Sequence, residues 1–116
     1  ESNNTTATAD PVTASNTTVT GNLGSTTDTD YFRVDLPAGK TLAASLTPTS
    51  TTADYDLYVY SSTGAQLSTS QNGAGATDTV NSANTTSGTA IRYVRVTYYG
   101  GGTGATNGRY TLKLSW

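Results

Sequence analysis

Residues 30–36 read Asp-Tyr-Phe-Arg-Val-Asp-Leu, and their alternation of polar and apolar side chains decides the fold class. Successive side chains of an extended strand point to opposite faces, so Phe32, Val34 and Leu36 share one face. The next four residues, Pro-Ala-Gly-Lys, are typical of a tight turn. A second alternating segment follows at 42–46, and we predict that the two strands form a hairpin.

The same alternation continues along most of the chain, and no segment has the 3.6-residue period of a helix. The further segments that we predict as strands are 17–23, 57–60, 65–69, 76–83, 91–98 and 109–116. About eight short strands at this spacing are typical of an all-β sandwich or barrel built from antiparallel sheets. The glycine-rich segment 100–108 is predicted to be a loop with little order.

The predicted core is small for a chain of 116 residues. Its inward side chains are Val19, Leu23, Phe32, Val34, Leu36, Leu42, Leu46, Leu57, Val59, Val80, Val94, Val96, Tyr110, Leu112 and Leu114. Each contributes about 1.5–3 kcal/mol when fully buried, and chain entropy opposes most of the sum. Because the chain has no cysteine, a bound cation is the candidate for additional stabilisation. We expect a polar lead-in at 1–16 that packs on a β-sandwich domain at 17–116.

The composition excludes several classes of function. The chain has no His and no Cys, so it lacks Ser-His-Asp and Cys-His catalytic groups and Cys-based metal sites. A net charge of −2 predicts no binding to nucleic acid or to anionic membranes, and no apolar run is long enough to span a bilayer. Low charge and 26 threonines suit a protein that works outside the cell. The polar residues 1–4 do not form a signal peptide, so we expect a fragment of a longer precursor.

Five motifs in a fixed order carry a resemblance to a known family. They are Asp-Thr-Asp-Tyr-Phe-Arg-Val at 28–34, Leu-Pro-Ala-Gly at 36–39, Ala-Asp-Tyr-Asp-Leu-Tyr-Val-Tyr at 53–60, Tyr-Val-Arg-Val at 93–96 and Gly-Arg-Tyr-Thr-Leu at 108–112. In this order and spacing the chain resembles the bacterial pre-peptidase C-terminal domain, which is related to the accessory domains of clostridial collagenases. The resemblance implies a jelly-roll-like β-sandwich with a non-catalytic role, following the catalytic domain of a secreted peptidase.

The resemblance also implies a calcium site. In many such domains the ligands come from a polar N-terminal segment and from an Asp-x-Asp before the second strand. Glu1, Asn3 and Asn4 match the first part, and Asp28 and Asp30 match the second. Both aspartates would project to one side of a regular strand, and calcium prefers such oxygen ligands. The residues alone leave an alternative open, in which Asp28 caps a turn and Asp30 is solvated.

Asp54 and Asp56 form a second pair of carboxylates. Two carboxylates can act as acid and base in glycoside hydrolysis, but no other predicted feature supplies a cleft beside this pair. We favour a structural role, in which Asp56 accepts backbone hydrogen bonds in the loop before its strand. The resembled family holds this aspartate as part of its fold signature.

Tyr58, Tyr60, Tyr93 and Tyr99 are the candidate substrate-binding residues. Exposed aromatic side chains give a large contact area at low entropic cost, and they stack on sugar rings or pack against a protein fibre such as collagen. The alternative is cross-strand pairing, in which each tyrosine only stabilises its sheet. Clustering would favour binding, and the sequence does not show clustering. The arginines, Arg95 among them, are predicted to lie on a solvated face.

We therefore expect a secreted, non-catalytic accessory domain with calcium as its candidate cofactor. Its expected partners are the peptidase domain of the same precursor and an insoluble protein substrate such as collagen. Binding would hold the catalytic domain near that substrate and raise its effective concentration. Two alternatives stay open: a carbohydrate-binding module, and a processing or secretion segment with no ligand. An enzyme in its own right is the least favoured interpretation.

Overall fold

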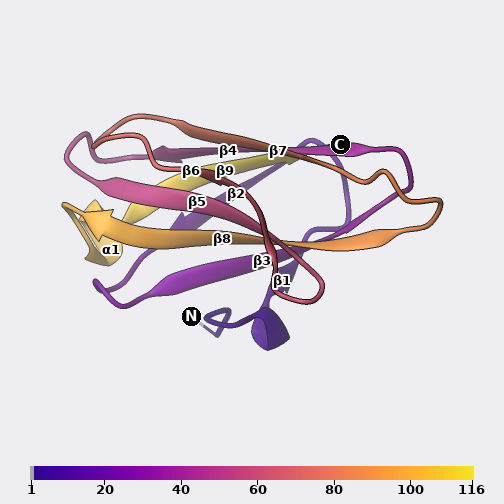
Figure 1. The fold of residues 1–116 in the computed structure, drawn as a ribbon. Helices are drawn as coiled ribbons and strands as arrows, with labels where there is room; N and C mark the ends of the chain where they lie inside the picture. The colour runs from indigo at the N-terminus through magenta and orange to yellow at the C-terminus, as the bar shows by residue number, and fades with distance from the viewer. Residues whose placement is uncertain (1) are drawn as a thin grey trace.

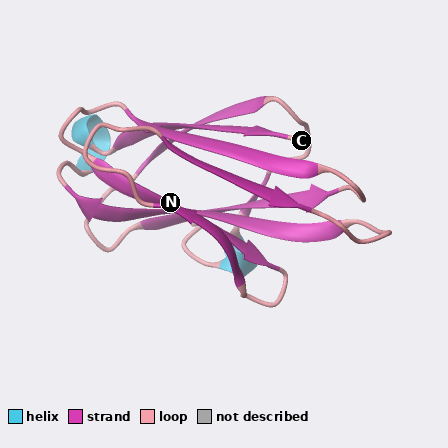
Figure 2. Ribbon diagram, turned by 45° about the horizontal axis from the view of Figure 1, so that its top comes forward, coloured by secondary structure: helices cyan, strands magenta, loops and turns pink. Residues whose placement is uncertain are grey.

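The computed structural model describes residues 2–116, and within this range nine strands form two sheets that face each other (Figures 1 and 2). The strands are β1 (Asp10–Pro11), β2 (Thr17–Asn22), β3 (Thr29–Leu36), β4 (Thr41–Pro48), β5 (Asp54–Ser61), β6 (Gln66–Ser70), β7 (Asp78–Ala83), β8 (Ala90–Gly100) and β9 (Arg109–Ser115). The five-stranded sheet has the order β1-β3-β8-β5-β6, and the four-stranded sheet has the order β2-β9-β4-β7. Two short helices, η1 (Thr6–Thr8) and α1 (Gly104–Asn107), lie at the periphery (Figure 2). The prediction of an all-β sandwich is confirmed.

The core lies between the two sheets and consists of the side chains that alternation assigned to the inner faces. Every predicted inward side chain is buried except Val19, which packs partly buried against the core. The structure adds Val12, Ala44, Ala53 and Tyr55 to the core. Tyr55 tolerates complete burial because its hydroxyl donates hydrogen bonds to two backbone carbonyls, those of Gly102 and Asn107.

The predicted hairpin between segments 30–36 and 42–46 is wrong, because β3 and β4 lie in different sheets. β3 pairs with β8, whereas β4 pairs with β7 and β9. The turn between them carries the chain across the sandwich, and Asn84 holds it by donating from Nδ2 to the carbonyl of Leu36 at 2.9 Å. Alternation shows which face of a strand is buried but not which strand is its hydrogen-bonding partner. Two consecutive strands that face each other across a core have the same pattern as a hairpin.

The prediction of little order at 100–108 is also wrong. The segment contains α1, and the amide of Leu23 donates to the carbonyl of Gly108 at 2.9 Å. Gly101 has a positive φ of 78°, and a Cβ there would lie 1.9 Å from the carbonyl oxygen of Thr52. Glycine is therefore required here for a close backbone approach, and its presence does not indicate mobility.

The lead-in lies along the outer edge of β3. β1 pairs with β3 in parallel, and the amide of Val12 donates to the carbonyl of Arg33 at 2.8 Å. Further towards the N-terminus, the amide of Tyr31 donates to the carbonyl of Asn3 at 2.8 Å. These bonds bring the polar N-terminal residues to the beginning of β3. No helix within residues 2–116 is long and apolar enough to cross a membrane.

Candidate binding face and cation site

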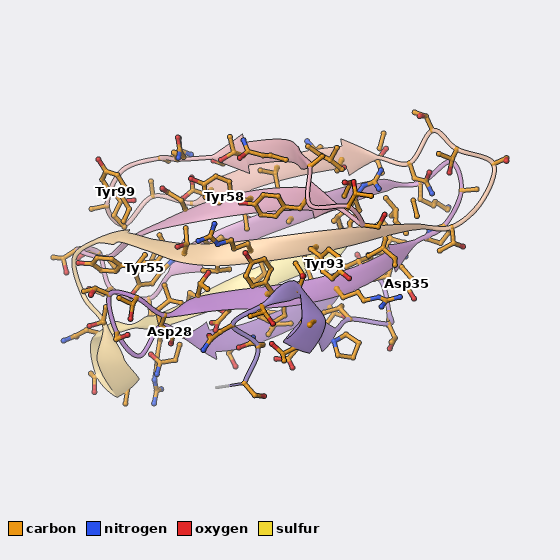
Figure 3. The ribbon with its side chains drawn as sticks, turned by 60° about the horizontal axis from the view of Figure 1, so that its bottom comes forward. Asp28, Asp35, Tyr55, Tyr58, Tyr93 and Tyr99 are labelled. Atoms are coloured by element: carbon orange, nitrogen blue, oxygen red, sulfur yellow. The ribbon has the colours of Figure 1, made fainter. Side chains whose placement is uncertain are left out.

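Tyrosines from three adjacent strands gather on the outer face of the five-stranded sheet. Tyr58 and Tyr60 of β5 are stacked, with ring centroids 6.0 Å apart and an interplanar angle of 13°. Tyr31 of β3 lies 6.5 Å from Tyr60 between centroids. Tyr93 of β8 is the register partner of Tyr60, and it lies over the same sheet as Tyr58 in Figure 3. These four residues together with Arg95 are called the tyrosine face below.

Arg95 lies at the centre of the tyrosine face and is not simply solvated as predicted. Its guanidinium carbon is 5.8 Å from the ring centroid of Tyr31 and 5.7 Å from that of Tyr58. Its Nε donates to the hydroxyl of Thr29 at 3.0 Å, and its Nη1 donates to the hydroxyl of Tyr60 at 3.3 Å. Partial burial lowers the pKa of Arg95, but the tyrosine hydrogen bond and the neighbouring rings outweigh burial and raise it. The result is a fixed positive charge among aromatic rings.

Tyr99, the fourth tyrosine predicted for substrate binding, lies away from the other three. It is 72% exposed near the end of β8 and lines a pocket of about 340 Å³ together with Asp54, Asp56 and Gln71. The prediction that no cleft lies beside Asp54 and Asp56 is therefore wrong. Asp56 also lies within β5 and not in a loop before the strand.

The Asp56 carboxyl is buried, and no basic group among residues 2–116 affects its pKa. The side chain is 4% exposed, and its pKa is raised to about 6 by burial first, then by the charges of Asp54 and Asp78. A hydrogen bond from Gln71 opposes this shift. Burial also raises the pKa of Asp54, with Asp78 as the second cause. The charge of Asp78 thus disfavours ionisation of both Asp54 and Asp56 at this end of the sheet.

Of the residues predicted as metal ligands, Asn4 and Asp28 meet at the beginning of β3, whereas Glu1 lies outside the described residues. Asn3 is 3% exposed, and its Oδ1 has no hydrogen-bond partner among residues 2–116. With its amide nitrogen turned towards β3, Asn4 donates to the carbonyl of Thr29 at 2.6 Å and to Asp28 Oδ1 at 2.9 Å.

The two aspartates of this group occupy different environments. Asp28 precedes β3, where its carboxylate accepts the amide of Gly24 at 2.7 Å and the amide of Thr29 at 3.0 Å. Asp28 therefore caps the turn before β3, and its role as a metal ligand stays a prediction. Asp30 is 0% exposed and accepts a hydrogen bond from the hydroxyl of Tyr110, so the expectation that it is solvated is wrong. Because Asp28 lies before the strand, the shared orientation expected within a regular strand does not apply.

No three acidic side chains among the described residues lie close enough together to hold a metal ion. A cation at the beginning of β3 would therefore use amide and backbone carbonyl oxygens together with Asp28. Calcium accepts such mixed oxygen ligands.

The sequence analysis missed Tyr31 and Arg95 as members of the binding face. Their outward orientation was predictable from alternation, because each lies between inward residues of its strand. Their proximity depends on register: Arg95 is opposite Tyr31 in the β3–β8 pair and opposite Tyr58 in the β5–β8 pair. No local pattern carries that information.

A model of one protein family matches most of the chain. It is described as the bacterial pre-peptidase C-terminal domain and matches residues 28–115. The match covers all strands from β3 to β9 and the predicted motifs that lie on them. Among curated protein sequences, none matches the chain.

Several solved structures have a similar fold. The pre-peptidase C-terminal domain of collagenase from Bacillus anthracis is 18% identical over 92% of both chains, with a TM-score of 0.65. The Yersinia pseudotuberculosis-derived mitogen is 13% identical over 85% of this chain and 83% of its own, with a TM-score of 0.67. The periplasmic lysozyme inhibitor PliG of Aeromonas hydrophila is 14% identical over 92% of this chain and 96% of its own, with a TM-score of 0.62. At these identities the likeness shows a shared fold alone.

Proposed function

The chain belongs to the bacterial pre-peptidase C-terminal domain family, a family of non-catalytic domains, and we propose that it holds a secreted peptidase on an insoluble protein substrate. The partner domain would be the peptidase of the same precursor. Tethering raises the local concentration of the substrate around the catalytic domain without new chemistry.

The single observation that carries this proposal is the clustering of the tyrosine face. Tyr31 of β3 and Tyr58 and Tyr60 of β5 form a chain of ring contacts across the intervening strand β8, and Arg95 of β8 is packed among them. Interface hot spots are enriched in tyrosine and arginine, because these side chains combine large contact areas with polar tips. The rings also restrain one another, so binding orders fewer free side chains. A face of clustered aromatic rings suits an extended fibre such as collagen.

We further propose that calcium stabilises the domain by fastening the lead-in to β3. The buried Oδ1 of Asn3, without a hydrogen-bond partner among residues 2–116, supports this proposal. The approach of the Asn4 side chain to Asp28 Oδ1 and to the carbonyl of Thr29 supports it as well. Asn3, Asn4 and Asp28 would then share the ion with Glu1, and the bound ion would neutralise their clustered oxygens.

The test of the proposed function is co-sedimentation of the purified chain with insoluble collagen fibres, and in parallel with chitin and with cellulose. We expect saturable binding to collagen only. Replacing Tyr60 with Ala should weaken binding about tenfold or more, because this ring contacts both Tyr31 and Tyr58.

The matched control is Tyr99→Ala, which removes a more exposed tyrosine outside the tyrosine face. It should bind collagen like the unmodified chain. Binding to chitin or cellulose alone would favour a carbohydrate-binding module instead. Binding to none of the three would favour a processing or secretion segment.

A further inference from the structure

A single glutamine connects the pocket at Asp56 to the tyrosine face. Gln71 follows β6 directly, and its Nε2 donates to the hydroxyl of Tyr58 at 2.7 Å. Gln71 also lines the pocket that contains Asp56, and it lowers the pKa of that carboxyl. Asp56 and Tyr58 lie two residues apart on one face of β5, so the amide bridges neighbours along the strand.

The groups around Asp56 are acidic or neutral on every side. Asp54 precedes it in β5, and Asp78 contributes its charge from β7. Thr97 of β8 is the register partner of Asp56, and the neutral residues Asn72 and Tyr99 line the pocket that contains Asp56. Among residues 2–116, no basic side chain contributes to the pKa shift of Asp56. Gln71 is therefore the group that stabilises the ionised form of Asp56.

The Gln71–Tyr58 bond belongs to the tyrosine face as much as to the pocket. Tyr58 stacks on Tyr60 and lies beneath the guanidinium of Arg95. Its hydroxyl is anchored to Gln71, which itself lies in the segment between β6 and β7. When Asp56 loses its negative charge, it becomes a weaker acceptor for the Gln71 amide, which also donates to Tyr58.

We propose that Asp56 is an acid-sensitive latch on the tyrosine face. Ionised Asp56 holds Gln71, and through it Tyr58, in the binding position, and protonation of Asp56 loosens both. The effect on affinity rests on the proposed function, whereas the coupling of Asp56 to Tyr58 can be measured in the free domain. A charge-assisted hydrogen bond is about twice as strong as a neutral one, so the expected loss of affinity on acidification is about fivefold.

The first measurement follows the ring resonances of ¹³C-labelled tyrosines by NMR between pH 7.5 and 4.5. We expect the Tyr58 ring to shift with a midpoint near pH 6. The shift should disappear in Asp56→Asn. In Gln71→Ala, which leaves the buried carboxyl in place, the Asp56 carboxyl should still titrate while Tyr58 no longer responds. Asp35→Asn is the matched control, because it removes an exposed carboxylate from β3. In this variant the Tyr58 ring resonance should shift with pH as in the unmodified chain.

The second measurement repeats collagen co-sedimentation at pH 7.5 and pH 5. Binding about fivefold weaker at pH 5 in the unmodified chain, and equal at both pH values in Gln71→Ala, would support the latch. A Tyr58 ring resonance that does not shift between pH 7.5 and 4.5 would overturn the latch, whether or not collagen binds. A pH-dependent shift of the Tyr58 ring resonance together with equal collagen binding at both pH values would overturn the proposed effect of the latch on affinity. A pH-dependent shift of the Tyr58 ring resonance without collagen binding at either pH would support the coupling of Asp56 to Tyr58 and overturn collagen as the proposed ligand.

Discussion

Gly21 of β2 has no side chain because Tyr110 of β9 occupies the space where one would lie. The two residues are register partners, and a Cβ on Gly21 would be 2.2 Å from both Cζ and the hydroxyl oxygen of Tyr110. Tyr110 in turn is buried and donates to Asp30, which is also buried. One glycine therefore allows an aromatic ring to reach a buried carboxylate near the beginning of β3.

Replacing Gly21 with Ala should destabilise the domain by about 3 kcal/mol, since the ring of Tyr110 must move within a packed core. The measurement is the free energy of unfolding from urea titration. Gly88→Ala is the matched control, because nothing lies within 4 Å of a Cβ at that glycine. Equal stability of the two variants would contradict the proposed packing.

The lead-in and β3 act together at the scale of elements. The backbone of Asn3 pairs with Tyr31, and β1 pairs with Phe32 and Arg33, so the lead-in covers part of an edge that would otherwise be exposed. These backbone bonds hold the lead-in where the Asn4 side chain reaches Asp28 and the carbonyl of Thr29. A cation at this place would therefore join two elements.

Calcium should raise the melting temperature of the chain by about 5 °C or more relative to excess chelator, because a ligand bound only by the folded state stabilises that state. In Asp28→Asn this difference should largely disappear. Comparing each variant with itself, with and without calcium, cancels the structural cost of changing a residue that accepts two backbone amides. Asp35→Asn should retain the full response.

An unchanged melting temperature in the unmodified chain would remove calcium from the proposal. A full calcium response in Asp28→Asn would place the ion elsewhere in the domain.

The whole molecule carries its negative charge unevenly. Arg33–Asp35 is the ion pair found among the described residues, and both of its side chains are largely exposed. Asp54, Asp56 and Asp78 instead gather at one end of the sandwich, where the pKa values of Asp54 and Asp56 are raised. The stability of the domain should therefore depend on pH through Asp56 more than through its surface ion pair.

A carboxyl with a higher pKa in the folded chain than in the unfolded chain binds a proton more readily when folded. The stability that Asp56 contributes therefore increases as the pH falls from 7 through about 6 and is complete below about 4. Allowing for screening by water in the open pocket, the gain is about 1–2 kcal/mol. It should appear in urea unfolding as the difference between the unmodified chain and Asp56→Asn, measured at pH 7 and pH 5.

Asp56→Asn should be the more stable of the two at pH 7, and its advantage should shrink at pH 5. An advantage that stays constant between these pH values would show that Asp56 has an ordinary pKa. Asp35→Asn is again the control, with no change in the pH dependence expected.

Several features of this protein follow from its sequence alone. The alternation in residues such as Phe32, Val34 and Leu36 identifies the buried face of each strand, because the side-chain period of a strand is two everywhere. The order of the motifs predicts the family, which the match at 28–115 confirms. The absence of His and Cys excludes the catalytic groups that depend on them, whatever the fold.

Other features were decided only by the tertiary structure. Alternation could not show that β3 and β4 lie in different sheets, or that Arg95 stands between Tyr31 and Tyr58. The sequence also could not show that Gln71 bridges Asp56 and Tyr58. Which face of a strand is buried is a local property of the chain. Strand partners and register instead result from packing between residues far apart in the sequence, and the tyrosine face and the Asp56 pocket are built from those contacts.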